Sequence, residues 1–171
     1  MRLLGLDPGL TVTGWGVLVS QDNRLRYVDG GIVRSSPTGS LSERLVQIHR
    51  GVVEVIERYN PEVAAVEETF VNRNPASALK LGQARGALLL TVAMFDMPVH
   101  EYAANSIKKA VVGVGHAQKQ QVRAMIGALL PGSKLTSSDA ADALAVAICH
   151  AHSMTPVSVQ NSMVGNGGRV T

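Results

Sequence analysis

Four acidic residues stand where separate predicted elements end or begin, and together they could hold a metal ion. Asp7 closes the apolar run LLGLD and Glu67 closes VAAVE, whereas Asp139 and Asp142 open the helical pattern SSDAADALAVAICHAH. Neighbouring carboxylates repel one another and resist joint ionisation, so such a cluster is reasonable mainly as a cage for hard cations that prefer oxygen ligands. If the fold brings these side chains together, the sequence predicts metal-assisted attack on a phosphate.

Each acid taken alone also has a purely structural interpretation. Asp7 begins an Asp-Pro-Gly sequence, which is a common turn. Glu67 could be a solvent-exposed strand end, since it and Glu68 must point to opposite faces of a strand. Asp139 and Asp142 share one helix face because they are three residues apart, but an acid in a first turn also gains from the helix dipole. Four such placements in one chain favour the metal site.

The elements that must position these acids follow from hydrophobic periodicity. Three strand-like runs separated by turn residues come first, which is typical of an antiparallel meander. Strands are expected at 2–7, 13–20, 25–34, 63–66 and 97–102, and helices at 41–59, 74–95, 105–112, 118–130 and 137–150. Three antiparallel strands followed by alternating helices and strands predict an α/β layer fold.

Length and composition predict one folded domain and a tail. The chain has 171 residues, and the segment 153–171 has one charged residue and no sustained periodicity, so we expect a folded domain over 1–152 and a flexible tail over 153–171. No run approaches the roughly 18 apolar residues of a membrane span, and the start is too short for a signal peptide. The single Cys149 excludes an intrachain disulfide, which agrees with a cytoplasmic location.

Charge is distributed unevenly along the chain. Residues 1–68 contain 7 Lys or Arg and 9 Asp or Glu, residues 69–136 contain 8 and 2, and residues 137–171 contain 1 and 2, giving net charges of −2, +6 and −1. A basic middle beside an acidic site suits a polyanionic partner. The alternative is a basic face that is simply solvated.

Six motifs together resemble the RuvC family of Holliday junction resolvases over about residues 1–152: LLGLDPG, TGWGV, VAAVEETF, SALKLGQARG, VVGVGHAQKQQV and DAADALAVAICHAH. The resemblance implies a ribonuclease H-like (retroviral integrase superfamily) fold, with a central mixed five-stranded sheet flanked by helices. It implies a homodimer that acts on four-way junction DNA in homologous recombination and DNA repair. By motif position, Asp7, Glu67, Asp139 and Asp142 match the family's metal-binding catalytic acids.

The resemblance also implies a reaction. Two Mg²⁺ ions, for which Mn²⁺ could substitute, would assist hydrolysis of a phosphodiester and leave a 3′-hydroxyl and a 5′-phosphate. Two sites related by a dimer axis would make paired, symmetric nicks. The RuvA and RuvB branch-migration proteins are implied as partners.

Candidate DNA contacts lie in the basic middle of the chain. Lys108 and Lys119 match family positions near the scissile phosphate, and Arg123 shares a helix face with Lys119. Phe70 matches a family phenylalanine that could stack against unstacked bases, with core packing as the alternative. Further DNA contacts are expected from Arg73, Asn74 and Lys80.

Gly82 and Gly86 are four residues apart in ALKLGQARGALL, so another backbone could approach one face of that helix closely. We expect this face to form part of the dimer interface. The alternative is tight packing of the helix on the protein's own sheet.

Two other functions remain open at this point. The run LGLDPGLTVTGWGVL also resembles the phosphate loop of actin and sugar-kinase nucleotide-binding domains, although those proteins need a second such domain and an adenosine loop. A protein that binds junctions without cleaving them is the other alternative, and the intact set of four acids argues against it.

Overall fold

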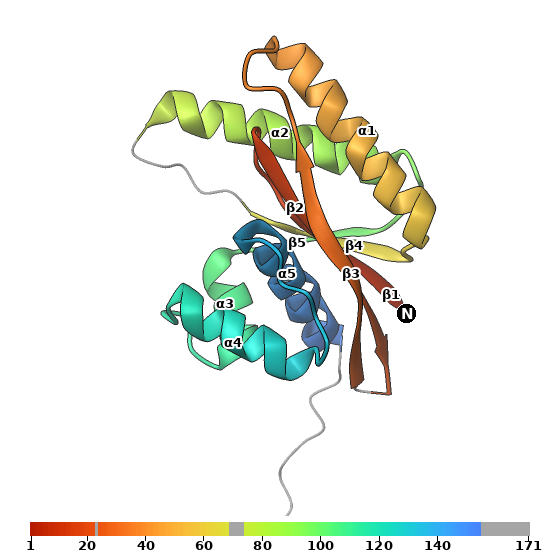
Figure 1. The fold of residues 1–171 in the computed structure, drawn as a ribbon, viewed down its shortest axis with the longest axis vertical. Coiled ribbons are helices and arrows are strands. Elements are labelled where there is room, and N and C mark those ends of the chain that lie inside the picture. The colour runs from red at the N-terminus through yellow and green to blue at the C-terminus, as the bar shows by residue number, and fades with distance from the viewer. Residues whose placement is uncertain (23, 69–73, 155–171) are drawn as a thin grey trace, which may run out of the picture.

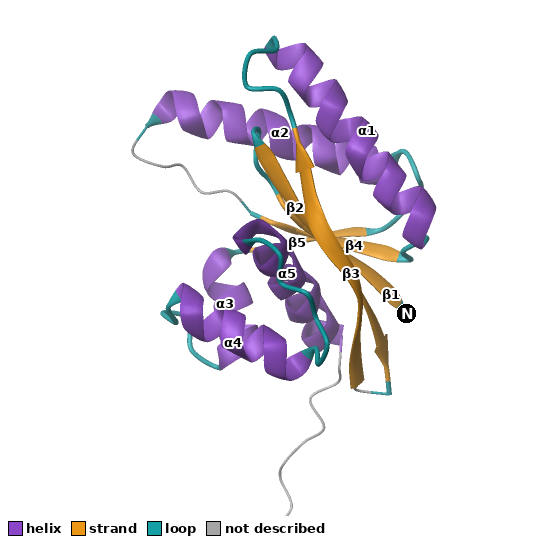
Figure 2. Cartoon of the chain, in the orientation of Figure 1, coloured by secondary structure: helices purple, strands orange, loops and turns teal. Residues whose placement is uncertain are grey.

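A computed structural model describes residues 1–22, 24–68 and 74–154, which form a sheet covered by helices on both faces (Figures 1 and 2). The strands are β1 (Arg2–Asp7), β2 (Val12–Gln21), β3 (Arg24–Arg34), β4 (Val63–Glu67) and β5 (Val99–Tyr102). The helices are α1 (Leu41–Tyr59), α2 (Pro75–Ala93), α3 (Ala104–Val112), α4 (Lys119–Leu129) and α5 (Ser138–Met154). The element order is the predicted one.

The sheet is mixed, and its central strand is the one that ends at Asp7. The strand order is β3-β2-β1-β4-β5. β1 pairs antiparallel with β2 and parallel with β4, and β5 extends the parallel half. This is the mixed five-stranded sheet flanked by helices that the family resemblance implied.

Local signals explain why most helix boundaries agree with the predictions. Ser40 and Glu43 form a capping box at the start of α1, and Asn60 ends that helix in the left-handed region at φ 45°. The Asn74 side chain accepts hydrogen bonds from the backbone at the start of α2, as expected of an N-cap before proline.

The last helix is the exception, because it continues four residues beyond the predicted end at His150. The hydroxyl of Tyr102 in β5 lies 2.7 Å from His150 Nδ1 and 2.9 Å from Ser153 Oγ. These contacts with the sheet give the last turn of α5 tertiary partners, which a pattern of apolar residues does not reveal.

Side chains of the central strand alternate between two cores. Leu4 and Leu6 pack on the side of α1 and α2, whereas Leu3 packs on the side of α5. Gly5 and Asp7 therefore lie on the α5 face of the sheet.

Three strand glycines make that face smooth enough for α5 to lie directly on the backbone. A Cβ at Gly5 would lie 2.0 Å from the carbonyl oxygen of Ala143, and one at Gly14 would lie 2.0 Å from that of Asp139. A Cβ at Gly16 would meet the side chain of Leu144 at 2.6 Å. The first half of α5 consequently follows a glycine trough, formed by Gly5, Gly14 and Gly16, across β1 and β2.

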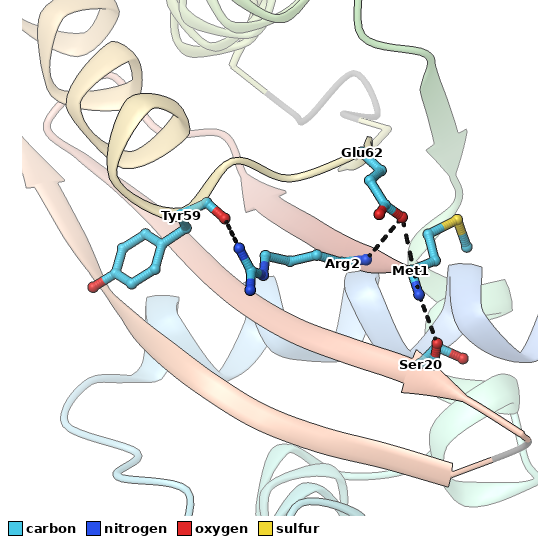
Figure 3. Close-up of polar contacts among 5 residues, drawn as sticks. All are labelled: Met1, Arg2, Ser20, Tyr59 and Glu62. Atoms are coloured by element: carbon cyan, nitrogen blue, oxygen red, sulfur yellow. Dashed lines mark hydrogen bonds and ion pairs between the residues drawn. The ribbon is translucent and has the colours of Figure 1, made fainter.

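Polar contacts hold the start of β1 to the neighbouring segments of the chain (Figure 3). The Arg2 guanidinium donates to the Tyr59 carbonyl oxygen at 2.5 Å, and the Arg2 backbone N–H donates to Glu62 Oε2 at 3.2 Å. The terminal ammonium of Met1 donates to the Ser20 carbonyl oxygen at 3.0 Å and lies 3.9 Å from Glu62. These bonds add to the ladders that set the register of the strand carrying Asp7.

None of the helices in the described part of the chain is long and apolar enough to cross a membrane.

Replacing Gly14 with alanine should destabilise the protein, because its Cβ would overlap the Asp139 backbone. Overpacking of this kind costs about 1 to 3 kcal/mol, so we expect a clearly lower urea midpoint for Gly14→Ala. Gly127→Ala is the matched control, since a Cβ there meets nothing within 4 Å and Gly127 lies in α4. That variant should be stabilised by up to about 1 kcal/mol. Equal midpoints for both variants would contradict the close seating of α5.

Candidate active site

The four acids come from three elements that meet at one end of the sheet. Leu6 of β1 pairs with Val66 of β4, and Asp7 and Glu67 follow these residues directly. Both side chains therefore leave the sheet at the carboxyl ends of adjacent parallel strands.

The register around Glu67 follows from the two cores. Val63 and Ala65 pack on the α5 side, whereas Ala64 and Val66 pack on the α1 and α2 side. Alternation along β4 places Glu67, rather than Glu68, on the α5 face with Asp7.

The glycine trough brings the other two acids to the same place. Asp7 pairs across the strands with Gly14, and the Asp139 backbone lies directly on Gly14. The Ser137 hydroxyl accepts a hydrogen bond from the Ala140 N–H at 3.0 Å, so Ser137 caps the start of α5. Asp139 and Asp142 occupy the first turns of this helix, beside the end of β1.

Burial and neighbouring charge together raise the pKa values of three of these acids. Burial raises the pKa of Asp7 to about 8, with further contributions from Glu67, Asp142 and Asp139, while Lys119 opposes the rise. Burial and the nearby Asp142 also raise the pKa of Glu67, against Lys108 and Lys119. The carboxylates thus lie within electrostatic range of one another on a half-buried surface, which is where perturbed groups mark candidate sites.

Asp142 connects this cluster to the basic residues. Burial raises the pKa of Asp142, and Lys119 opposes the effect as the nearest cation. The Lys119 ammonium lies 3.5 Å from Asp142 Oδ2, yet 82% of the Lys119 side chain is exposed. A lysine held at one end by a carboxylate and otherwise free can turn towards a phosphate.

The other predicted DNA contacts have different surroundings. The Arg123 guanidinium donates to the Leu135 carbonyl oxygen at 2.5 Å, so it also holds the loop that leads into α5. Asn74 is exposed at the N-cap of α2, and Lys80 is exposed in the second turn of that helix. Phe70 and Arg73 lie outside the described residues.

The donor set fits a hard divalent cation. The carboxylates of Asp7 and Glu67 accept no hydrogen bond from any residue that the structure describes, and burial, together with the neighbouring acids, raises their pKa values despite the nearby lysines. Over 1–22, 24–68 and 74–154, no three acidic, histidine or cysteine side chains already converge on one point as ligands. Modest rotations of the acidic side chains would therefore have to accompany ion binding.

Gly82 and Gly86 do not serve tight packing on the protein's own sheet. A Cβ at either position would meet nothing within 4 Å, and both residues are exposed on α2. Of the two interpretations of this pair, packing within the chain is wrong, and the dimer interface stays a prediction.

The residues that sequence reasoning missed are the glycines of the trough. Gly5, Gly14 and Gly16 carry no chemistry, but they decide how closely α5 approaches β1. The signal was present in TGWGV, where two glycines separated by one residue leave one face of a strand without side chains.

Comparison with known proteins agrees with this geometry. The family model described as "Crossover junction endodeoxyribonuclease RuvC" matches residues 3–150. Proteins of that name from Paramagnetospirillum magneticum and Rhodospirillum rubrum are 59% and 60% identical over 152 residues, which are 89% of this chain and 92% and 90% of theirs. The structure of T. thermophilus RuvC in complex with Holliday junction substrate matches with a TM-score of 0.83 at 39% identity, over 90% of this chain and 94% of that one. The ribonuclease H-like fold expected from the sequence is confirmed.

Replacing Asp7 with asparagine should stabilise the metal-free protein in a pH-dependent manner. In the folded chain Asp7 has a pKa of about 8, against 3.8 ordinarily. Between these two pH values the unfolded chain loses the proton and the folded chain keeps it, so the free energy of unfolding is highest below about pH 3.8 and falls as the pH rises towards 8. The asparagine side chain of the variant has no ionisable group, so it avoids this loss of stability. In EDTA, Asp7→Asn should therefore unfold at least about 3 °C above the wild type at pH 8, with a smaller difference at pH 5.

Asp22→Asn, on the exposed turn after β2, is the control and should show no such trend. A Tm difference for Asp7→Asn that is constant from pH 5 to pH 8 would contradict the raised pKa of Asp7.

Proposed function

The chain belongs to the RuvC family of crossover junction endodeoxyribonucleases, and from that premise we propose that it is a Holliday junction resolvase that nicks four-way DNA junctions with divalent metal ions. One observation carries the proposal: four carboxylates from β1, β4 and α5 lie within electrostatic range at one end of the sheet, with a pKa of about 8 at Asp7. Such a cluster is poorly stabilised by the protein itself and well suited to a cation.

Asp7, Glu67, Asp139 and Asp142 would hold two Mg²⁺ ions, and Mn²⁺ would also suit these oxygen ligands. When bound, the ions would supply activation of water and stabilisation of the leaving oxygen in an in-line displacement, leaving a 3′-hydroxyl and a 5′-phosphate. The protein's own contribution is position: β1 and β4 fix two of the acids, and the trough fixes the other two.

Lys108 and Lys119 would bind the phosphate beside these acids. Both lysines oppose the rise in the pKa values of Glu67 and Asp142, so both place positive charge at the cluster. DNA would engage Lys119 through its exposed side chain, which pairs only at its tip with Asp142. We propose further DNA contacts from Phe70, Arg73, Asn74, Lys80 and Arg123.

A homodimer would use the outer face of α2. Along that helix Leu79, Gly82, Gly86, Leu90 and Met94 are three or four residues apart, so they form one stripe. Its large members, Leu79, Leu90 and Met94, are 63–65% exposed in the single chain. An exposed apolar stripe with small residues at its centre suits a second copy of the same helix.

A two-fold dimer would present two identical sites to the two strands of like polarity in a junction. Paired symmetric nicks with ends that a ligase seals would follow. Since the substrate would be chromosomal recombination and repair intermediates, we place the chain in the cytoplasm and expect it to work beside the RuvA and RuvB proteins.

Because the chain belongs to the RuvC family, we no longer consider the alternative that it is an actin-like nucleotide-binding domain. A junction-binding protein without catalysis differs from the proposal in one measurable property, a metal-dependent nick.

Asp7→Asn should abolish cleavage but not binding. Losing one acid of the site should slow nicking of a branch-migratable four-way junction at least about a hundredfold, or about 3 kcal/mol in activation free energy. Junction affinity, measured by gel shift in Ca²⁺ or EDTA, should stay at or above the wild-type value because one negative charge is removed. Denaturing gels with Mg²⁺ or EDTA, followed by ligase treatment, give the readout.

A matched linear duplex is the substrate control, and Asp22→Asn is the protein control. Binding of the junction by the wild type without Mg²⁺-dependent nicks would show a structural junction protein instead. Normal cleavage by Asp7→Asn would remove Asp7 from the site.

Leu90→Glu should convert the dimer to a monomer. Leu90 is 63% exposed in the single chain, so the substitution leaves its core intact, but a charge in an apolar interface lacks a partner. Sedimentation velocity should give a dimer for the wild type and a monomer for the variant, with paired nicking reduced to single nicks. Val114→Glu, at a 57% exposed position after α3, should remain dimeric. A monomeric wild type at assay concentrations would refute the interface.

A further inference from the structure

A groove of about 480 Å³ opens between α1 and the last residues of β3, on the sheet face opposite the four acids. Trp15, Val33 and Val55 contribute apolar surface to it. Arg34, Arg50 and Glu54 are among the exposed charged residues of its rim. An apolar base with a charged rim is the usual composition of a protein-binding groove.

The groove exists because β3 is the edge of the sheet. β3 ends the strand order, and no strand in the described ranges pairs with its outer side. Figure 1 shows α1 beginning near the end of this edge strand and running at an angle to it. A Cβ at Gly51 of α1 would lie 2.5 Å from the Val33 side chain, so helix and strand touch closely there. An edge strand beside such a groove is a ready site for one more strand.

The aromatic part of the groove is held in place. A Cβ at Gly31 would lie 2.8 Å from the Trp15 ring, so the indole extends from β2 across the backbone of β3 towards the open edge. The Tyr59 ring lies 5.5 Å from the Trp15 ring, and its hydroxyl donates to Asp29. Trp15 is half-buried and keeps surface in the groove. A fixed, partly exposed tryptophan is a typical anchor of a binding surface.

The arginines of the rim have positive charge to offer a ligand, although Arg58 lies near enough to Asp29 to help lower the pKa of that carboxyl. Arg34, Arg50 and Arg58 form no ion pair with any other residue of the described ranges. Arg58 instead lies over the Tyr59 ring at 5.2 Å. Along α1 the charges at 50, 54 and 58 alternate as plus, minus, plus, at steps of about 6 Å.

We propose that this groove binds an extended acidic segment of a partner protein, added alongside β3. Side chains on one face of a strand repeat at about 7 Å. A bound segment with an acidic, an apolar and an acidic residue at successive alternate positions would therefore fit the groove. Its two carboxylates would lie against Arg50 and Arg58, and its apolar side chain would lie over Trp15. The neutral middle residue avoids repulsion from Glu54.

The same charge order disfavours two other occupants. A nucleic acid strand carries a negative charge at every step, so one phosphate would face Glu54. The chain's own segment 155–171 contains one arginine and no acidic residue, so its side chains offer no carboxylate to the rim arginines.

Trp15 is the single tryptophan of the chain, so its fluorescence reports binding at the groove directly. The probe is a capped peptide of about nine residues with Asp, Phe and Asp at alternate central positions and Thr between them. Added to the full chain, it should change Trp15 emission saturably. R50E and R58E should each weaken binding at least about tenfold, because each sets a like charge against an Asp.

A second peptide, with Lys in place of both Asp residues, tests the same contacts with the charges reversed. It should bind the R50E/R58E double variant and not the wild type. R24E is the matched control, since Arg24 is exposed at the far end of β3 from the groove, and it should bind the acidic peptide like the wild type. Junction cleavage by R50E/R58E should equal that of the wild type, so this proposal and the nuclease assignment fail independently.

Three results would overturn the proposal. The first is no emission change with the acidic peptide, and the second is a change that R50E and R58E leave intact. The third is a Trp15 response to single-stranded DNA or to a 155–171 peptide in place of the acidic peptide, which would assign the groove to that occupant.

Discussion

The direct seating of α5 on a strip of backbone without side chains is the contact on which the rest of the structure depends. Ordinary side chains at Gly5, Gly14 and Gly16 would hold a helix away from the sheet, whereas here the Ala143 and Asp139 carbonyl oxygens lie where a Cβ would be. The helix therefore delivers its first turns to the end of β1. Without that approach Asp7 and Glu67 would be two strand-end acids, and the other pair would be an acidic helix start.

Bringing these charges together costs stability, and the surrounding structure offsets it. The pKa of Asp7 at about 8 shows how unfavourable its ionisation is in the folded chain without a cation. Two apolar cores, one on each face of the sheet, hold the strands and α5 in place regardless of the charges at their ends. The bonds of Met1 and Arg2 secure the far end of β1. The site is thus held by packing at a distance from it, so the acids themselves remain available for a cation.

Sequence reasoning succeeded where the determining interactions are local. The limits of α1 follow from the Ser40 capping box and from Asn60 before a proline, and those signals are within a few residues of each boundary. Asp7 and Glu67 are predicted to end their strands because each closes an apolar run, and both do. The choice between Glu67 and Glu68 needed the two cores, since alternation defines opposite faces but not which face meets α5. The extra turn of α5 depends on Tyr102, about fifty residues earlier. Phe70 and Arg73 lie outside the described residues, so their role remains a prediction.

Glycine has opposite consequences on the two faces of the same sheet. On the α5 face Gly14 removes the space between helix and strand, so that Asp139 approaches the partner of Asp7. On the α1 face Gly31 makes room for the Trp15 ring, which reaches towards an edge that no described strand covers. Gly14 and Trp15 are consecutive residues of β2, so the side-chain position of Gly14 and the Trp15 ring lie on opposite faces of the sheet. A ligand in the groove would therefore not block the end of β1 that carries Asp7. The sheet separates the two surfaces by its own thickness.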